Sequence, residues 1–98
     1  MKTTFIYSLI DPVTLDIKYI GKSDNIDNRL KKHLQKCYYN KPSLKNNWIK
    51  SLLKKGIKPI IEIIDEIPFA EWRFWEKHYI SLYKSWGFKL KNMTIGGD

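Results

Sequence analysis

Residues 4–21 read TFIYSLIDPVTLDIKYIG and predict a β-hairpin. Residues 4–10 and residues 17–21 are rich in β-branched and aromatic side chains, which favour strands. The intervening DPVTLD supplies turn-forming residues, with Asp-Pro first. Two such strands so close together in the sequence pair as an antiparallel hairpin. We expect a register in which Tyr7 stands opposite Tyr19, which places both phenol groups on one face of the sheet.

Helix signals follow the hairpin. Asp24 or Asn25 can cap a helix that runs to about residue 37. A second helix is predicted over residues 42–56, because Pro-Ser opens it and a glycine ends it.

The last part of the chain predicts one more strand and one more helix. The apolar run at residues 60–64 is too short for a helix and predicts a third strand. A third helix is predicted over residues 68–84, and a short extended segment over residues 89–95. The order ββααβα predicts an α+β fold, with a small three-stranded sheet, mixed or antiparallel, flanked by three helices.

Composition narrows the class of protein. The 98 residues are enough for one domain, and 18 Lys and Arg against 10 Asp and Glu give a net charge of +8. Such an excess of positive charge favours a polyanionic partner, usually nucleic acid. No apolar run approaches the length of a membrane-spanning helix, and the single Cys37 excludes an internal disulfide.

Charged and polar side chains interrupt the apolar faces of two predicted helices. Arg29 and His33, four residues apart, lie within the apolar stripe of the first helix. Glu76 lies among the aromatic residues of the third helix, where a carboxylate must be paired, protonated or bound to a cation. Arg29 could snorkel from the edge of its stripe, His33 could be an ordinary half-buried histidine, and Glu76 could form a structural salt bridge with Arg29. With Tyr7 and Tyr19, these residues otherwise form a polar set suited to phosphodiester hydrolysis.

Two tripeptides and three later residues carry a resemblance to a known family. Phe5-Ile6-Tyr7 and Tyr19-Ile20-Gly21 resemble the two tripeptides that give the GIY-YIG nucleases their name, with Phe5 in place of the first glycine. Arg29 and Glu76 resemble the family's arginine and metal-binding glutamate, and Asn92 resembles the asparagine of its last motif. The resemblance covers essentially the whole chain and is closest to the catalytic domains of phage-type homing endonucleases.

The resemblance implies a role for each matched residue. Glu76 would hold one divalent cation, Mg²⁺ or Mn²⁺, with waters completing its coordination. Arg29 would bind the scissile phosphate and stabilise the charge that develops on it. Tyr7 would act as the general base for water, or help to position it, with nearby cations making its phenol more acidic. Of the supporting residues, Tyr19 would orient water or phosphate, His33 would hydrogen-bond Tyr7 or the phosphate, and Asn92 would support the site.

The sequence therefore predicts a metal-dependent DNA endonuclease, a phosphodiester hydrolase whose single catalytic domain spans residues 1–98. A further DNA-binding region could follow residue 98. Two alternatives remain open: a non-catalytic nucleic-acid-binding module that retains the fold, and a basic protein-interaction domain whose polar cluster is a structural ion pair. We expect DNA as the partner, a monomer, no membrane association, no small-molecule cofactor, and an intracellular, cytoplasmic location in a phage or microbial host. The residues predicted to contact nucleic acid are Lys22, Arg29, Lys32, Lys36 and Lys45.

Overall fold

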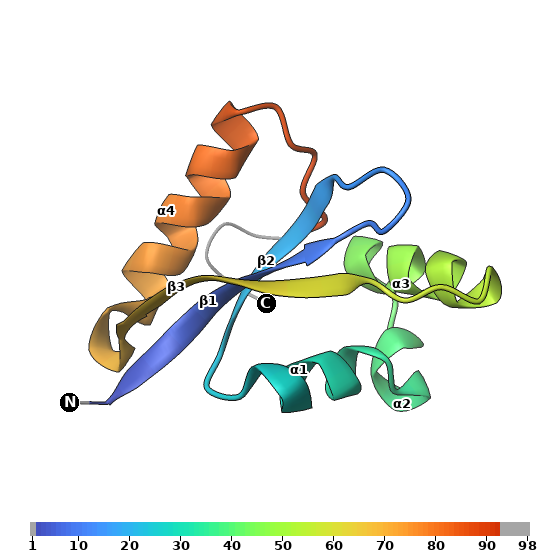
Figure 1. Ribbon diagram of the computed structural model, residues 1–98, viewed down its shortest axis with the longest axis horizontal. Helices are drawn as coiled ribbons and strands as arrows, with labels where there is room; N and C mark the ends of the chain where they lie inside the picture. Colours follow the sequence, from blue (N-terminus) through green and yellow to red (C-terminus); the bar gives the residue numbers. More distant parts are fainter. Residues whose placement is uncertain (1, 93–98) are drawn as a thin grey trace.

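A three-stranded antiparallel sheet forms the middle layer of the computed structural model, which describes residues 2–92. The central strand β1 (Thr3–Ile10) pairs with β2 (Ile17–Ser23) on one side and β3 (Ile60–Pro68) on the other. One helix, α4 (Trp72–Ser85), covers one face of the sheet (Figure 1).

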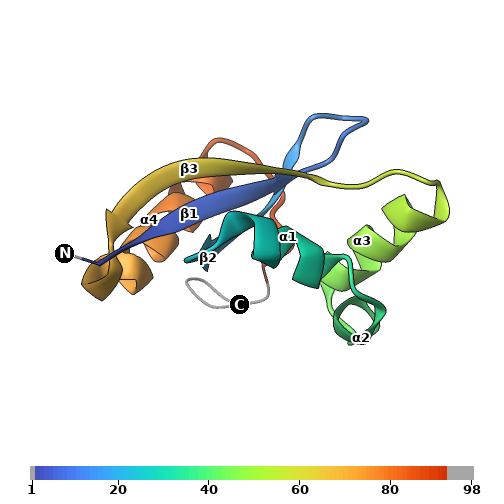
Figure 2. The same ribbon diagram turned by 60° about the horizontal axis from the view of Figure 1, so that its bottom comes forward.

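The helices between β2 and β3 lie on the opposite face of the sheet. These are α1 (Ile26–His33), α2 (Lys36–Tyr39) and α3 (Leu44–Lys54) (Figure 2). The predicted α+β class and the order ββααβα are confirmed. None of the helices within residues 2–92 has the length and apolar character needed to cross a membrane.

The chain breaks into two helices where one helix to about residue 37 was predicted. The Asn25 side chain caps α1 by accepting a hydrogen bond from the Asn28 N–H at 3.1 Å, and Gln35 then adopts an extended backbone. The cause of the break lies in α3, whose buried Asn46 donates hydrogen bonds to the carbonyls of Tyr38 (3.0 Å) and Lys41 (2.7 Å). The chain must turn after α1 to bring these carbonyls onto α3. The predicted helix end near residue 37 is therefore wrong, because contacts with α3 and not the local sequence set where α1 ends.

The later boundaries differ less from the prediction. The Ser43 hydroxyl caps α3, β3 continues to Pro68, and a short 3₁₀ turn, η1 (Phe69–Glu71), precedes α4. Of the predicted C-terminal segment, residues 89–92 run beside β2, where the Lys91 N–H donates to the Lys18 carbonyl at 2.5 Å. Residues 93–95 lie outside the described part of the chain.

Alternation along β1 divides the apolar side chains between two cores. Tyr7 and Leu9 face the α1–α3 side, where Tyr19, Trp48, Ile49 and Leu52 complete one core. Ile6 faces α4, and its core is completed by Ile20, Ile67 and Ile80. The sheet therefore separates two groups of buried residues, and the parity of a strand residue decides which group it joins.

The hairpin register differs by two residues from the predicted one. Tyr7 stands opposite Gly21, and Tyr19 stands opposite Leu9, so the prediction that the two tyrosines face each other is wrong. The Tyr7 ring lies over Gly21 so closely that a Cβ there would be 2.5 Å from Tyr7 Oη. A bulge between Leu9 and Ile10 absorbs the difference at the turn. A slip of two preserves parity, and both phenols remain on one face.

Phe5, the departure from the family's first tripeptide, occupies an ordinary strand position. It is half-buried in β1, and among the described non-glycine residues only Leu15 has a positive φ. No glycine is required at position 5, whereas the absence of a side chain at Gly21 is required by the Tyr7 ring.

Gly21→Ala should destabilise the fold by roughly 1–3 kcal/mol, because the added methyl overlaps the Tyr7 ring. The same substitution in a Tyr7→Leu background should cost less, since the obstacle is gone. Urea denaturation of the four proteins of this double-mutant cycle measures the coupling. Equal losses in both backgrounds would show that the Tyr7 ring is not what excludes a side chain at residue 21.

Candidate active site

Three buried rings from three elements form an aromatic cluster beneath α1. Tyr7 comes from β1, Tyr19 from β2 and His33 from the last turn of α1. Tyr7 Oη lies 2.8 Å from His33 Nε2, and the Tyr19 and His33 ring centroids are 5.8 Å apart. Burial, followed by the charges of Lys45 and Arg29, lowers the pKa of His33 to about 3. His33 is therefore neutral near pH 7 and serves Tyr7 as a hydrogen-bond partner without adding charge.

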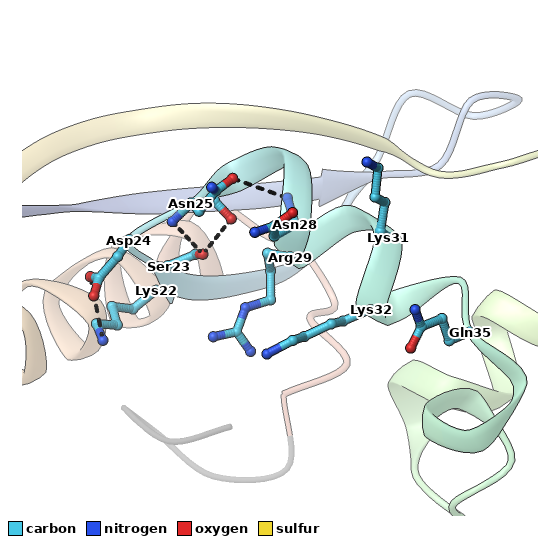
Figure 3. Close-up of a pocket in the computed structure, with 9 residues that line it drawn as sticks. All are labelled: Lys22, Ser23, Asp24, Asn25, Asn28, Arg29, Lys31, Lys32 and Gln35. Atoms are coloured by element: carbon cyan, nitrogen blue, oxygen red, sulfur yellow. Dashed lines mark hydrogen bonds and ion pairs between the residues drawn. The ribbon is translucent and has the colours of Figure 1, made fainter.

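A basic groove of about 370 Å³ lies beside this cluster, along the end of β2 and the start of α1. Figure 3 shows Arg29 and Lys32 reaching from α1 into the same space, while Lys31 points the opposite way. The residues that line the groove are Lys22, Ser23, Asp24, Asn25, Asn28, Arg29, Lys31, Lys32 and Gln35.

Lys22 is held at the β2 end of the groove by several contacts. Its Nζ lies 3.7 Å from Asp24 Oδ1, 4.8 Å from the Phe69 ring centroid and 5.2 Å from that of Trp72. A hydrogen bond from Thr4, then the charges of Lys22 and Lys2, outweigh burial and lower the pKa of Asp24. Lys22 lies on the α4 side of the sheet because it is even-numbered, like Ile20 of the same strand. Its contacts there hold the ammonium group in place.

Glu76 of α4 is a buried carboxylate that has no hydrogen-bond partner among the described residues. It is 1% exposed, and within residues 2–92 neither carboxylate oxygen has a hydrogen bond or an ion pair. Burial raises its pKa to about 6, against the opposing charges of Lys22 and Arg29. The structural salt bridge between Arg29 and Glu76, considered as an alternative, is therefore not formed in the described part of the chain.

An unpartnered, buried carboxylate facing cations is a fitting ligand for a small hard cation. Residues 2–92 contain no group of three or more His, Cys, Asp or Glu side chains that could hold a metal ion. A cation at Glu76 would therefore have one protein carboxylate, with water and substrate oxygens as its other ligands, which is an ordinary arrangement for Mg²⁺.

The predicted polar set draws its members from elements on both faces of the sheet. Tyr7, Tyr19 and His33 lie on the α1–α3 face, whereas Glu76 belongs to the helix on the other face. Arg29 connects the two halves, because its charge acts on both groups: it helps to lower the pKa of His33 and opposes the rise that burial causes in the pKa of Glu76. The parity of Lys22 was the signal in the sequence that could have identified the α4 side of the site.

Three further predicted residues lie around this centre. Asn92 acts as a substitute for a neighbouring strand: its Oδ1 accepts from the Ile20 N–H at 3.1 Å, and its Nδ2 donates to the Ile20 carbonyl at 2.7 Å. Lys36 is exposed at the start of α2. Lys45 of α3 is half-buried, with its Nζ 5.1 Å from the Tyr19 ring centroid.

Comparison with known protein families agrees with the two tripeptides. The model of the GIY-YIG catalytic domain matches residues 3–91, and the chain belongs to this family of nucleases. No curated protein and no solved structure matches the chain significantly.

Glu76→Gln should be more stable than the wild type by about 1–2 kcal/mol at pH 8 without metal, because ionising a buried carboxylate is costly. With a pKa raised from 4.5 to about 6, the folded protein binds the proton more tightly than the unfolded chain. This stabilisation is complete below pH 4.5 and is lost as the pH rises through about 6. The stability advantage of Glu76→Gln over the wild type should therefore disappear near pH 4.5.

Urea denaturation across this pH range in the presence of a chelator measures the effect. The exposed Glu62→Gln on β3 is the matched control and should change stability by less than about 0.5 kcal/mol. A Glu76→Gln variant that is less stable than the wild type at pH 8 would mean that the carboxylate has a stabilising partner.

Proposed function

We propose that this chain is a metal-dependent DNA endonuclease that resembles the catalytic domains of homing endonucleases. The observation that carries the proposal is Glu76, a buried carboxylate with two unpartnered oxygens beside the charges of Lys22 and Arg29. An ionised group in this environment is costly for the folded state unless a cation accompanies it. A fold that only needed stability would gain from a neutral side chain at this position.

Arg29 is the residue proposed to hold the phosphate that is cut. It lines the basic groove from α1 and has no carboxylate partner within residues 2–92. Its planar guanidinium can donate two parallel hydrogen bonds to phosphate oxygens and can stabilise the charge that builds on them during hydrolysis. Lys22, fixed by Asp24 at the other end of the groove, adds a second positive charge on the side of Glu76.

Tyr7 is the proposed base, or the group that positions the attacking water. A neutral imidazole has one donating and one accepting nitrogen. In the tautomer with hydrogen on Nε2, His33 donates to Tyr7 Oη and favours a phenolate whose own proton has passed to solvent. The phenolate takes a proton from water as the water oxygen attacks phosphorus, and the departing oxygen is protonated as its bond to phosphorus breaks. Tyr19 orients the attacking water from β2.

A divalent cation at Glu76, Mg²⁺ or Mn²⁺, would supply charge neutralisation at the phosphate and at the departing oxygen. Glu76 is the residue proposed to hold it, and Asn92 supports the site indirectly by fixing β2 at Ile20. The buried, unpaired Glu76 disfavours both alternatives, because a binding module or a basic protein-interaction domain has no use for such a carboxylate beneath its cationic surface.

Cleavage of plasmid DNA with Mg²⁺ tests the proposal. The wild type should nick or cut, chelator should stop it, and Glu76→Gln and Arg29→Ala should each abolish it. Arg73→Ala is the matched control, because Arg73 is the chain's only other arginine and lies exposed on α4. A folded wild type that does not cleave at high concentration with either Mg²⁺ or Mn²⁺ would contradict the endonuclease proposal.

Tyr7→Phe should reduce the cleavage rate by about 10²–10⁴ while the domain stays folded, because only the hydroxyl that bonds His33 is removed. Single-turnover cleavage gives the rate, and circular dichroism reports the fold. Tyr39→Phe removes a hydroxyl on α2 and should cleave at the wild-type rate. If both variants cleave normally, Tyr7 is only a core residue.

A further inference from the structure

A second, smaller hollow shares Arg29 with the groove. It measures about 70 Å³ and is bounded by α1, α2 and α3, with Arg29, Lys32, His33, Tyr38 and Lys45 as its lining. Arg29 and Lys32 line both the groove and this cavity, so the two hollows are neighbours. One water takes up about 30 Å³ in the liquid, so the cavity has room for two oxygen-sized groups.

Positive charge around this cavity is not neutralised by the protein. Three of its five lining residues are cations, none is acidic, and within residues 2–92 none of the three forms an ion pair. Burial, and then the charge of Arg29, lowers the pKa of Lys45. Like charges brought together and partly desolvated destabilise the folded state unless an anion joins them.

Lys45 is the member whose placement is hardest to explain by packing alone. It comes from α3, is half-buried, and is held with its Nζ 5.1 Å from the Tyr19 ring centroid. Its ammonium group therefore lies against the aromatic cluster and faces the same cavity as Arg29. Its stem packs on Tyr19 and its ammonium group gains a cation–π attraction there, yet this charge has no carboxylate partner within residues 2–92.

We propose that this cavity binds a second phosphate of the nucleic acid strand, next to the phosphate that Arg29 holds in the groove. The identity of this ligand as a phosphodiester rests on the proposed endonuclease function. Lys45 and Lys32 supply its charge complement, and Tyr38 also lines the cavity. Lys45 is then a positioning residue: by fixing the neighbouring phosphate, it sets which phosphodiester reaches Arg29 and Glu76.

The salt dependence of DNA binding tests the contact. Each phosphate neutralised on duplex DNA contributes about 0.9 to the slope of log affinity against log salt. We expect fluorescence anisotropy with a short duplex and chelator, between about 50 and 200 mM salt, to give Lys45→Met a slope that is smaller in magnitude than the wild-type slope by about 0.9. Lys45→Arg should keep it. Lys54→Met, which removes a lysine from the exposed end of α3, is the matched control and should also keep the wild-type slope.

A slope for Lys45→Met equal to that of the wild type, or an equal loss in Lys54→Met, would overturn the proposal. Circular dichroism checks that each variant is folded, and Lys45→Gln replaces Lys45→Met if the latter is not.

A second measurement does not depend on DNA. Inorganic phosphate, compared with chloride at the same ionic strength, should raise the melting temperature of the wild type and of Lys54→Met, but less for Lys45→Met. If the wild type binds no DNA yet shows this difference, the anion site stands and the endonuclease proposal fails. If phosphate stabilises all three proteins equally, the cavity is not a phosphate site.

Discussion

The contact between the Tyr7 ring and Gly21 is the constraint on which the rest of the structure depends. Tyr7 can lie across the neighbouring strand only because residue 21 has no side chain, and this fixes which residues pair in the hairpin. The same placement brings Tyr7 Oη to His33, which in turn fixes the last turn of α1 and the position of Arg29 one turn earlier. Register, helix placement and site geometry are therefore consequences of one packing contact.

The two tripeptides of the family contain the two partners of this packing contact. Tyr7 in the first and Gly21 in the second are direct partners across the strand pair, whereas position 5 is a strand residue that accepts phenylalanine. The second tripeptide also holds the C-terminal side of the chain, because Ile20 exchanges two hydrogen bonds with the Asn92 side chain. Within residues 2–92, this side chain and not a further strand satisfies the outer edge of β2 at Ile20.

Local patterns in the sequence were enough to predict the elements, because alternation, caps and turn residues act within a few residues of each other. The register could not be predicted, since it depends on how a ring fits over the neighbouring strand. The end of α1 depends on hydrogen bonds from Asn46, farther along the chain. Helical periodicity identified Glu76 as a buried carboxylate, but it could not show which face of the sheet its helix covers.

The arrangement of charge explains why an arginine stands at residue 29 in a chain whose other basic side chains, apart from Arg73, are lysines. Arg29 lines the groove together with Lys22 and the smaller cavity together with Lys45. Burial and the neighbouring charge of Arg29 lower the pKa of Lys45, so a lysine in this setting loses its proton more easily. A guanidinium remains protonated in proteins and keeps its planar donors. Arginine is thus the basic side chain that can keep a fixed charge where the two cationic hollows meet, while that charge also acts on the carboxylate of Glu76.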